Sequence, residues 1–482
     1  MDDRPATVSP PQMDRLSSAG ERAVHDAALA ILADGGVRVD HDDARAILAE
    51  GGCTVDAETH LVTFPPDLVA DALDAAPSSF TVRGRGRQPD VTVGDGEPIR
   101  SPTAGLPYVV RHGDDRRFAR MADYETFLKL AQMENVLDAA NGVVVPRDVD
   151  GPAAGLETQK RDLLLTDKLP GGGVGEAGAR ACAEMVGIVH DDPDLSEYYL
   201  VGGASSISPR VWNETQTGSL LEHARMEQPV VIGSPMIAGV LGPAPLAGAM
   251  ALADAEVLAG IVLAQLVTRG TPVVYGMSCS NADMRYGTFT IGSPASALWT
   301  AVTGQMARYY GLPSRAGGCL TDAKTVDDQS GWESSFHRTV TALSGIDYVF
   351  NAAGVLDSFA TGSPEKVVLD CERIRAVQRF GDAFALDDDA FALDAIAETE
   401  PGERFLTRPE TADRAAAEFF APDLASRGTV DDWREDGNRT AFERAHDRVE
   451  TLLDDYERPP VDADVERDLE RYVAEKRVAA DG

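Results

Sequence analysis

The sequence has few cysteines, and their spacing forms no familiar framework. Five cysteines are spread over 482 residues, with no Cys-x-x-Cys pair and no short cluster of cysteine and histidine. An odd number at wide spacing is typical of a reduced, intracellular chain with buried thiols. We therefore expect no disulfide framework, no zinc site and a cytoplasmic protein.

A long uncharged hydrophobic run is also missing. The most apolar stretch, residues 243–267, is rich in alanine and glycine and contains Asp254 and Glu256. This pattern predicts a buried helix and not a membrane span, which needs about 20 consecutive apolar residues. Residues 1–12 carry acids and prolines without an apolar run, so no signal peptide is predicted. We expect a soluble protein that does not act at a membrane.

Positive charge is scarce. The chain has 44 basic residues, almost all arginine, against 79 acidic ones, and its formal net charge is −35. The acids are dispersed along the chain, which is typical of an acidic surface adapted to high salt, where the Debye length falls to about 3 Å at 1 M. A basic partner on that surface is the weaker alternative. Nucleic-acid binding is disfavoured, because it needs a basic footprint.

The common catalytic motifs are absent. The sequence has no GxSxG elbow, no HExxH pair and no Walker loop. Residues 171–175 are rich in glycine, but they lack the GxGxxG spacing and a following acid at the ribose position. Cys319, after a predicted strand, is better explained as a buried thiol than as a nucleophile. No metal ligand and no catalytic residue can therefore be named.

What the sequence does contain is an alternation of short apolar strands with long helices. Strands are predicted at residues 142–146, 169–174, 199–205, 229–235, 272–278, 313–319 and 347–352, with an eighth near 355–359 or 367–370. A strand followed by a crossover helix, repeated about eight times, predicts an α/β fold whose parallel sheet closes into a (β/α)8 TIM barrel. An open doubly wound sheet is the alternative.

Three regions follow from this pattern. Residues 1–100 are predicted to form an α+β extension, residues 101–385 the barrel, and residues 386–482 a charged helical extension. Helices are expected at 409–420 and 464–479 in the last region. They pack on the barrel or contact another subunit through residues such as Phe419 and Phe420, so we expect a homo-oligomer.

In a barrel, function lies at the carboxyl ends of the strands. The richest polar segment there, residues 317–333, holds Asp322, Gln329 and Trp332, and His337 follows one turn later. Trp332 could pack the start of its helix and His337 could be an ordinary core histidine. Alternatively, Trp332 with an aromatic neighbour such as Tyr275 or Phe350 presents a π face to a quaternary ammonium, worth about 2 kcal/mol when desolvated. The candidate substrate-binding residues are Trp332, His337, Gln329, Asp322, Tyr275 and Asn351.

Several motifs occur in a specific order over nearly the whole chain. They include Gly36-Val37-Arg38-Val39, Gly233-Ser234-Pro235-Met236, Gly242-Pro243-Ala244-Pro245, Asp328-Gln329-Ser330-Gly331-Trp332-Glu333 and Phe419-Phe420-Ala421-Pro422. Their order and spacing resemble the trimethylamine methyltransferase family. The resemblance implies a (β/α)8 barrel that moves a methyl group from an amine to the cobalt of a separate corrinoid protein. The chain itself would then hold no tightly bound cofactor.

One departure from the family pattern concerns the substrate. Founding members carry pyrrolysine at the position that aligns with Trp332 and use it to orient a tertiary methylamine. Members without it act on quaternary amines, so the resemblance implies a quaternary amine, with glycine betaine favoured. A quaternary nitrogen already makes the amine a leaving group, so catalysis needs alignment and no general acid. Methyl transfer to folate and a non-catalytic betaine-binding sensor are the alternatives.

Overall fold

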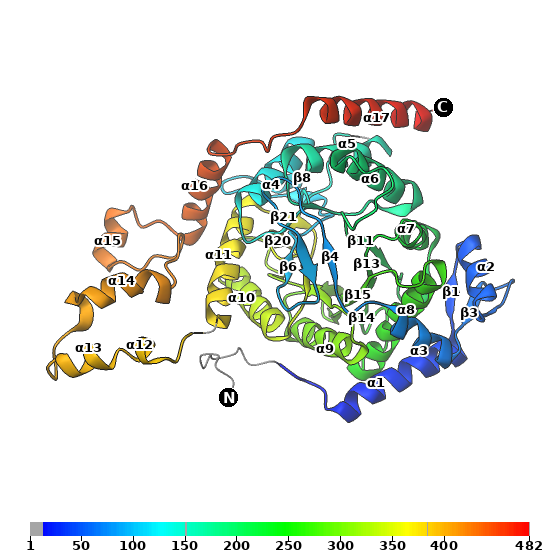
Figure 1. The fold of residues 1–482 in the computed structure, drawn as a ribbon, viewed down its shortest axis with the longest axis horizontal. Helices are drawn as coiled ribbons and strands as arrows, with labels where there is room; N and C mark the ends of the chain where they lie inside the picture. Colours follow the sequence, from blue (N-terminus) through cyan, green and yellow to red (C-terminus); the bar gives the residue numbers. More distant parts are fainter. Residues whose placement is uncertain (1–12, 150–151, 383, 482) are drawn as a thin grey trace.

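The structure is a computed structural model that describes residues 13–149, 152–382 and 384–481. Residues 1–12, on which the prediction about a signal peptide rests, lie outside the described part. The protein is mixed α/β, with short strands at the centre of a body of helices and a helical excursion at one side (Figure 1).

The N-terminal region alternates helices with short strands. Helix α1 (Ser18–Ala30) leads through a π-helical turn into β1 (Val37–Val39), followed by α2 (Asp42–Glu50), β2 (Thr54–Val55), β3 (Leu61–Thr63) and α3 (Pro66–Ala75). Gly36 lies between the first helix and the first strand with φ +60°, and a Cβ there would come within 2.6 Å of the Val62 carbonyl oxygen. Only glycine fits that turn.

Eight short strands at the centre of the body run through the chain in the order β6, β9, β10, β11, β13, β15, β18 and β19. Their bounds are Ile99–Arg100, Ala139–Ala140, Leu169–Pro170, Gly202–Ser205, Val230–Ser234, Val273–Met277, Arg315–Gly317 and Tyr348–Phe350. The ladders among these strands, all parallel, are β9–β10, β11–β13–β15 and β18–β19–β6.

Single contacts link these three groups. Parallel bridges join Gly171 to Val201 and Tyr275 to Ser314. The amide of Asp138 donates to the carbonyl of Arg100 (2.9 Å), which joins the start of β9 to β6. Every group of strands is therefore hydrogen bonded to the next.

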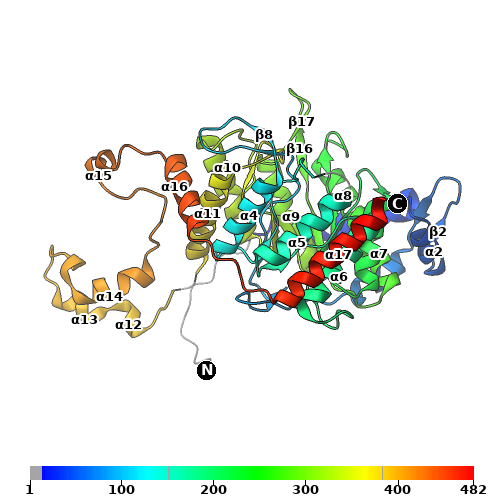
Figure 2. The same cartoon turned by 90° about the horizontal axis from the view of Figure 1, so that it is seen from above.

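A helix follows each of the eight strands and lies outside them (Figures 1 and 2). These helices are α4 (Met121–Met133), α5 (Pro152–Leu165), α6 (Gly175–His190), α7 (Glu214–Arg225), α8 (Leu246–Val267), α9 (Pro294–Tyr310), α10 (Asp328–Leu343) and α11 (Pro364–Gly381). Among the described helices, α8 alone is long and apolar enough to cross a membrane, but 78% of its most apolar window is buried. It is the buried helix that the sequence predicted.

Two strand predictions were wrong. The strand expected at residues 142–146 lies at β9, and Val144 makes only an isolated bridge to Leu106. The eighth strand is β6, at the start of the series, and neither of the two segments predicted for it belongs to the parallel strands. Val355–Leu356 (β20) pairs antiparallel with Thr361–Gly362 (β21), and residues 367–370 lie in α11. All three mistaken segments contain apolar residues that pack in the core. Strand β6 has two residues, too few to create an apolar pattern.

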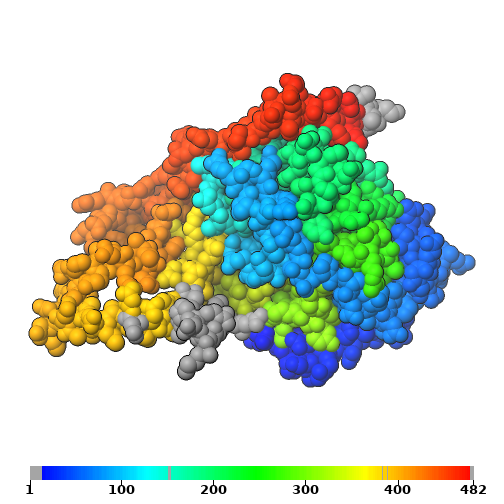
Figure 3. All heavy atoms as spheres, viewed as in Figure 1, coloured from blue at the N-terminus to red at the C-terminus, as the bar shows by residue number. Residues whose placement is uncertain are grey.

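The C-terminal region confirms the two predicted helices. Helix α17 (Ala463–Asp481) lies along α5 and α6, and α16 (Ala441–Asp454) packs on α11. Between α11 and α16 the chain makes an excursion, residues 384–435, that projects from the body (Figures 2 and 3). Its helices α13 (Leu393–Glu398), α14 (Pro409–Glu418) and α15 (Val430–Glu435) bury no residue.

Candidate functional site

A cavity of about 490 Å³ lies at the carboxyl ends of β13, β15, β18 and β19. On one side it is bordered by the hairpin of β16 (Ser280–Asp283) and β17 (Thr288–Thr290), which projects from the body in Figure 2. Most of its wall is apolar. The lining residues that matter below are Ser208, Ser278, Cys279, Phe289, Arg315, Phe350, Asn351 and Phe359.

Arg315 reaches the cavity from the first position of β18. Its stem lies against Gly276 of the neighbouring strand, where a Cβ would come within 3.2 Å of Cδ. Its guanidinium carbon lies 4.9 Å from the ring centroid of Phe350. Burial lowers the pKa of Arg315 to about 10, so it still carries its charge at neutral pH. This places a cation in a mostly apolar wall.

Aromatic rings form another part of the wall. Phe289 comes from β17 and Phe359 from the turn between β20 and β21, and their ring centroids lie 6.3 Å apart at an interplanar angle of 24°. Phe350, at the end of β19, lines the same space. Aromatic faces in a desolvated cavity attract a quaternary ammonium by up to about 2 kcal/mol.

A carboxylate lies behind the cavity wall. Glu256 of α8 is fully buried, and its side chain accepts hydrogen bonds from the hydroxyls of Ser206 (2.5 Å), Ser208 (2.6 Å) and Ser234 (2.7 Å) and from the amide of Arg210 (2.7 Å). No basic side chain of a described residue forms an ion pair with it. Since Ser208 lines the cavity, this negative group lies one hydroxyl away from the ligand space.

The thiol at the cavity is not a nucleophile. Cys279 lines the wall, and burial raises its pKa well above the usual value. A thiol in this state holds its proton at neutral pH. The charge of Glu256 raises the pKa of Cys279 and that of Arg315 lowers it, so both charges are felt at this part of the wall.

Of the six predicted substrate-binding residues, Asn351 lines the cavity. It follows β19 in the left-handed region with φ 60°, which asparagine tolerates, and its side-chain oxygen accepts a hydrogen bond from Thr103 (2.7 Å). Tyr275 is fully buried on the opposite face of its strand. Successive side chains of a strand alternate between its two faces, and this alternation turns Tyr275 toward α8, where its hydroxyl donates to Asp254.

The other four lie around the segment after β18, outside the cavity wall. Asp322 accepts hydrogen bonds from the amides of Ile291 and Gly292, and Gln329 donates to Glu333 (2.9 Å). His337 is buried within 3.2 Å of the Ser293 carbonyl, and burial lowers its pKa to about 4. Trp332 is 50% exposed. The structure therefore does not bring the six residues together, and their binding role stays a prediction.

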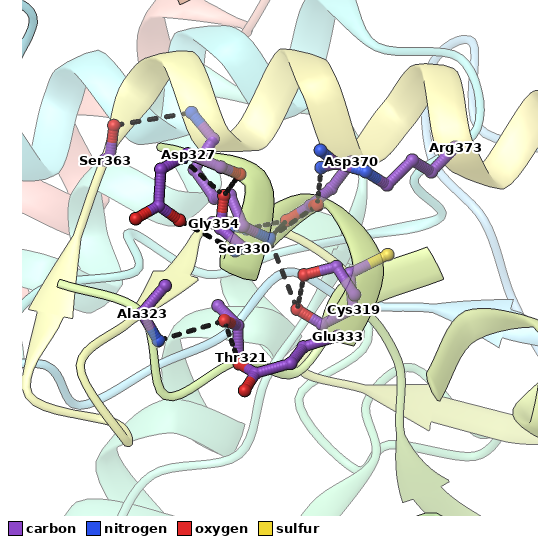
Figure 4. Close-up of polar contacts among 12 residues, drawn as sticks. Cys319, Thr321, Ala323, Asp327, Ser330, Glu333, Gly354, Ser363, Asp370 and Arg373 are labelled. Carbon is purple, nitrogen blue, oxygen red and sulfur yellow. Dashed lines mark hydrogen bonds and ion pairs between the residues drawn. The ribbon is translucent and has the colours of Figure 1, made fainter. Parts of the chain in front are cut away.

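That segment is held by a polar network (Figure 4). Glu333 accepts from the Thr321 hydroxyl (2.5 Å) and from the Asp322 amide. On the adjacent helix, Asp370 accepts from Lys366, Arg373 and the amide of Gly354. Among the described residues Asp370 forms ion pairs with Lys366 and Arg373, whereas Glu333 is held by hydrogen bonds from Thr321, Asp322 and Gln329, and the network positions the loops after β18 and β19.

Sequence reasoning missed Arg315 and Glu256. A signal for each was present, because an arginine inside a predicted apolar strand and a glutamate inside the most apolar helix are both unusual. Two further hollows continue the cavity. One of about 250 Å³ shares Arg315 and Phe350 with it, and one of about 570 Å³ shares Asn141 and residues 171–174 with the second. Within the described residues no group of three or more His, Cys, Asp or Glu could hold a metal ion.

The sequence is similar to known methyltransferases over nearly its full length. The family model of trimethylamine methyltransferase matches residues 3–480. A glycine betaine methyltransferase of Desulfitobacterium hafniense is 34% identical over 414 residues, which cover 85% of this chain and 86% of that protein. A trimethylamine methyltransferase of Methanosarcina barkeri is 28% identical over 470 residues, covering 94% and 93%.

A solved structure has a related fold. The monomethylamine methyltransferase of Methanosarcina barkeri superposes with a TM-score of 0.50 and 12% identity, covering 91% of this chain and 93% of that one. At that identity the likeness concerns the fold alone.

Proposed function

The chain belongs to the trimethylamine methyltransferase family and is a methyltransferase, and we propose that it transfers a methyl group from a quaternary amine, above all glycine betaine, to the Co(I) of a corrinoid protein. The choice of substrate is supported by the aromatic cavity at the strand ends, combined with 34% identity to a glycine betaine methyltransferase. A trimethylammonium group has the charge and the apolar surface that such a wall recognises.

The residues of this chain would bind and align the donor. Phe289, Phe350 and Phe359 would surround the ammonium and keep water from it, and Glu256 would add a negative charge nearby. Of the six residues predicted from the sequence, we keep Asn351 as a substrate contact. The reduced corrinoid of the partner supplies the nucleophile, and holding the donor in one orientation is the protein's share of the catalysis. No cofactor is proposed to bind tightly to this chain.

We also propose that the eight parallel strands close into a (β/α)8 barrel. Three observations support closure: the alternation of each strand with a helix, the parallel ladders, and the contacts that join the strand groups, including Asp138 to Arg100. The proposed regions remain 1–100, 101–385 and 386–482. Because β6 is Ile99–Arg100, the barrel would begin at the very end of the first region.

The chain is proposed to act as a homo-oligomer in the cytoplasm of a salt-adapted cell. The excursion supports the oligomer, because it exposes large apolar side chains and buries almost nothing against its own body; Phe391, Leu393, Ile396, Leu406 and Phe419 are each more than half exposed. All five cysteines are free and buried, which favours a reducing compartment. The net charge of −35 supports life at high salt.

The test is methyl transfer to free cob(I)alamin in high-salt buffer, followed by the visible spectrum. Glycine betaine should convert cob(I)alamin to methylcobalamin, and trimethylamine should not. Transfer from trimethylamine alone would overturn the choice of substrate. No transfer from any quaternary amine, to free cob(I)alamin or to a corrinoid protein encoded nearby, would overturn the proposed acceptor.

A further inference from the structure

We propose that Arg315 binds a carboxylate of the substrate and thereby restricts the enzyme to zwitterionic quaternary amines. A donor with the same trimethylammonium group but no acid, such as choline, would be rejected. The proposal rests on the proposed function only in taking a quaternary amine as the ligand. It adds the residue that selects among such amines, and it names the carboxylate as the chemical group that this residue binds.

The first argument is that the Arg315 guanidinium has no ion-pair or hydrogen-bond partner among the described residues. Most arginines of this acidic chain are paired with carboxylates, as Arg180 is with Glu222 and Arg117 with Asp123. Arg315 is partly buried, and removing a cation from water without giving it a partner is costly, so an unpaired cation in a cavity wall is typical of a site whose partner is the ligand.

The second argument is the position of the side chain. Arg315 lines both the cavity of about 490 Å³ and the adjoining one of about 250 Å³, so its head faces ligand space. Gly276 leaves room for the stem, and the Phe350 ring supports the guanidinium plane. Another buried arginine without an ion pair, Arg338, lines a separate cavity that also contains Glu97 and Asp382, and it shares no wall with the aromatic rings.

The third argument is the distribution of charge around the cavity. Glu256, behind Ser208, supplies negative charge, and Arg315 supplies positive charge. Both act on Cys279, a residue of the same wall. A zwitterion with its carboxylate on Arg315 and its ammonium among the phenylalanines would satisfy both charges. A simple cation would leave Arg315 without a partner.

The geometry of the guanidinium group should make Arg315 strongly selective for a carboxylate over a hydroxyl group. Arginine binds a carboxylate through two parallel N–H donors, and a hydroxyl group cannot accept both in the same way. Removing one partner of a buried charge pair weakens binding by about 100-fold or more. We therefore expect wild-type protein to bind glycine betaine at least about 100-fold more tightly than choline.

The experiment measures the affinity of the full-length protein for glycine betaine and for choline by titration calorimetry. Arg315→Gln should weaken glycine betaine binding by about 100-fold and bring its affinity close to that of choline. Arg315→Lys, which keeps the charge without the fork, should fall between them. Arg285 is an exposed arginine on the β16–β17 hairpin beside the cavity, and Arg285→Gln, which changes the net charge equally, should leave both affinities unchanged.

The outcomes separate this inference from the proposed function. An unchanged ratio of the two affinities in Arg315→Gln, or equal affinities in the wild type, would overturn the role of Arg315. Selective binding of glycine betaine without methyl transfer would support the role of Arg315 but overturn the proposed reaction. If Arg315→Gln does not fold, the wild-type ratio and Arg315→Lys decide the matter, and a lysine variant with wild-type selectivity would contradict the proposal.

Discussion

The carboxyl group of Asp254 and the hydroxyl of Tyr275 lie 2.7 Å apart in the core, between helix α8 and strand β15. Tyr310 of α9 donates to the other carboxyl oxygen, also at 2.7 Å, and its hydroxyl lies 3.1 Å from the imidazole Nδ1 of His25. The Tyr275 side chain therefore packs in the layer between the strands and the helices. Its neighbour in the chain, Gly276, lies on the face that makes room for Arg315.

This relationship predicts a pH-dependent stability. Burial raises the pKa of Asp254 from 3.8 to about 7, and the two tyrosine hydroxyls oppose the shift. In the unfolded chain the carboxyl ionises near pH 4, whereas the folded protein keeps the proton until about pH 7. The contribution of Asp254 to stability is thus fully present below pH 4, declines between pH 4 and 7, and is lost above.

The variant Asp254→Asn should remove that decline, because an amide does not ionise. The melting temperature of the variant relative to wild type should rise as pH increases from 4 to 7 and then stay level. The full effect is on the order of 4 kcal/mol. Measuring both proteins across this range cancels contributions shared by both, such as that of His25. Parallel pH profiles of the two proteins would contradict the assignment.

The serine cluster around Glu256 predicts a loss of stability when its acceptor is changed. Glu256→Gln replaces an oxygen by an amide donor that faces hydroxyl or amide donors, so the free energy of unfolding should fall by about 1–3 kcal/mol. Urea denaturation measures the change. Ser206→Ala removes one donor and should cost about 1 kcal/mol. A glutamine variant as stable as wild type would show that the cluster does not depend on the carboxylate.

The aromatic wall predicts a preference for positive charge. Phe289→Leu keeps the wall apolar but removes a π face, so affinity for glycine betaine should fall about 10-fold. Affinity for its carbon isostere, 3,3-dimethylbutanoate, which keeps the carboxylate but has an uncharged tert-butyl group in place of the ammonium, should change little. Tyr286→Leu is the comparison: Tyr286 is 76% exposed on the same hairpin and lies outside the cavity wall, so its variant should bind glycine betaine as the wild type does. Equal losses for both ligands in Phe289→Leu would show that the ring acts only by packing.

The excursion predicts how the chain assembles. Leu406 and Phe419 are 77% and 69% exposed, and no described part of the same chain covers them. Replacing both by glutamate should lower the molar mass in solution from that of an oligomer to that of a monomer, measured by light scattering at high salt. Met284→Glu, at a similarly exposed position on the β16–β17 hairpin, should leave the mass unchanged. A monomeric wild type would contradict the role of the excursion.

Local patterns in the sequence were sufficient for much of the fold. Apolar runs with turn residues at their ends located six of the eight central strands, and helical periodicity located α8, α14 and α17. These signals work because each depends on residues a few positions apart. Strand β6 was not predicted because two residues are too few to show an alternating apolar pattern. Its place in the sheet comes from pairing with β19, about 250 positions further along the chain.

The sequence by itself determined the family, through motifs in a fixed order, and the acidic, cysteine-poor character of the chain. Only the tertiary structure decided which side chains share the cavity. Strand register puts Arg315 beside Gly276, strand alternation turns Tyr275 away from it, and packing leaves the Arg315 guanidinium against the Phe350 ring with no hydrogen-bond or ion-pair partner among the described residues. These are relations between residues far apart in the chain, and a local pattern cannot contain them because the neighbours that create them arrive only when the chain folds.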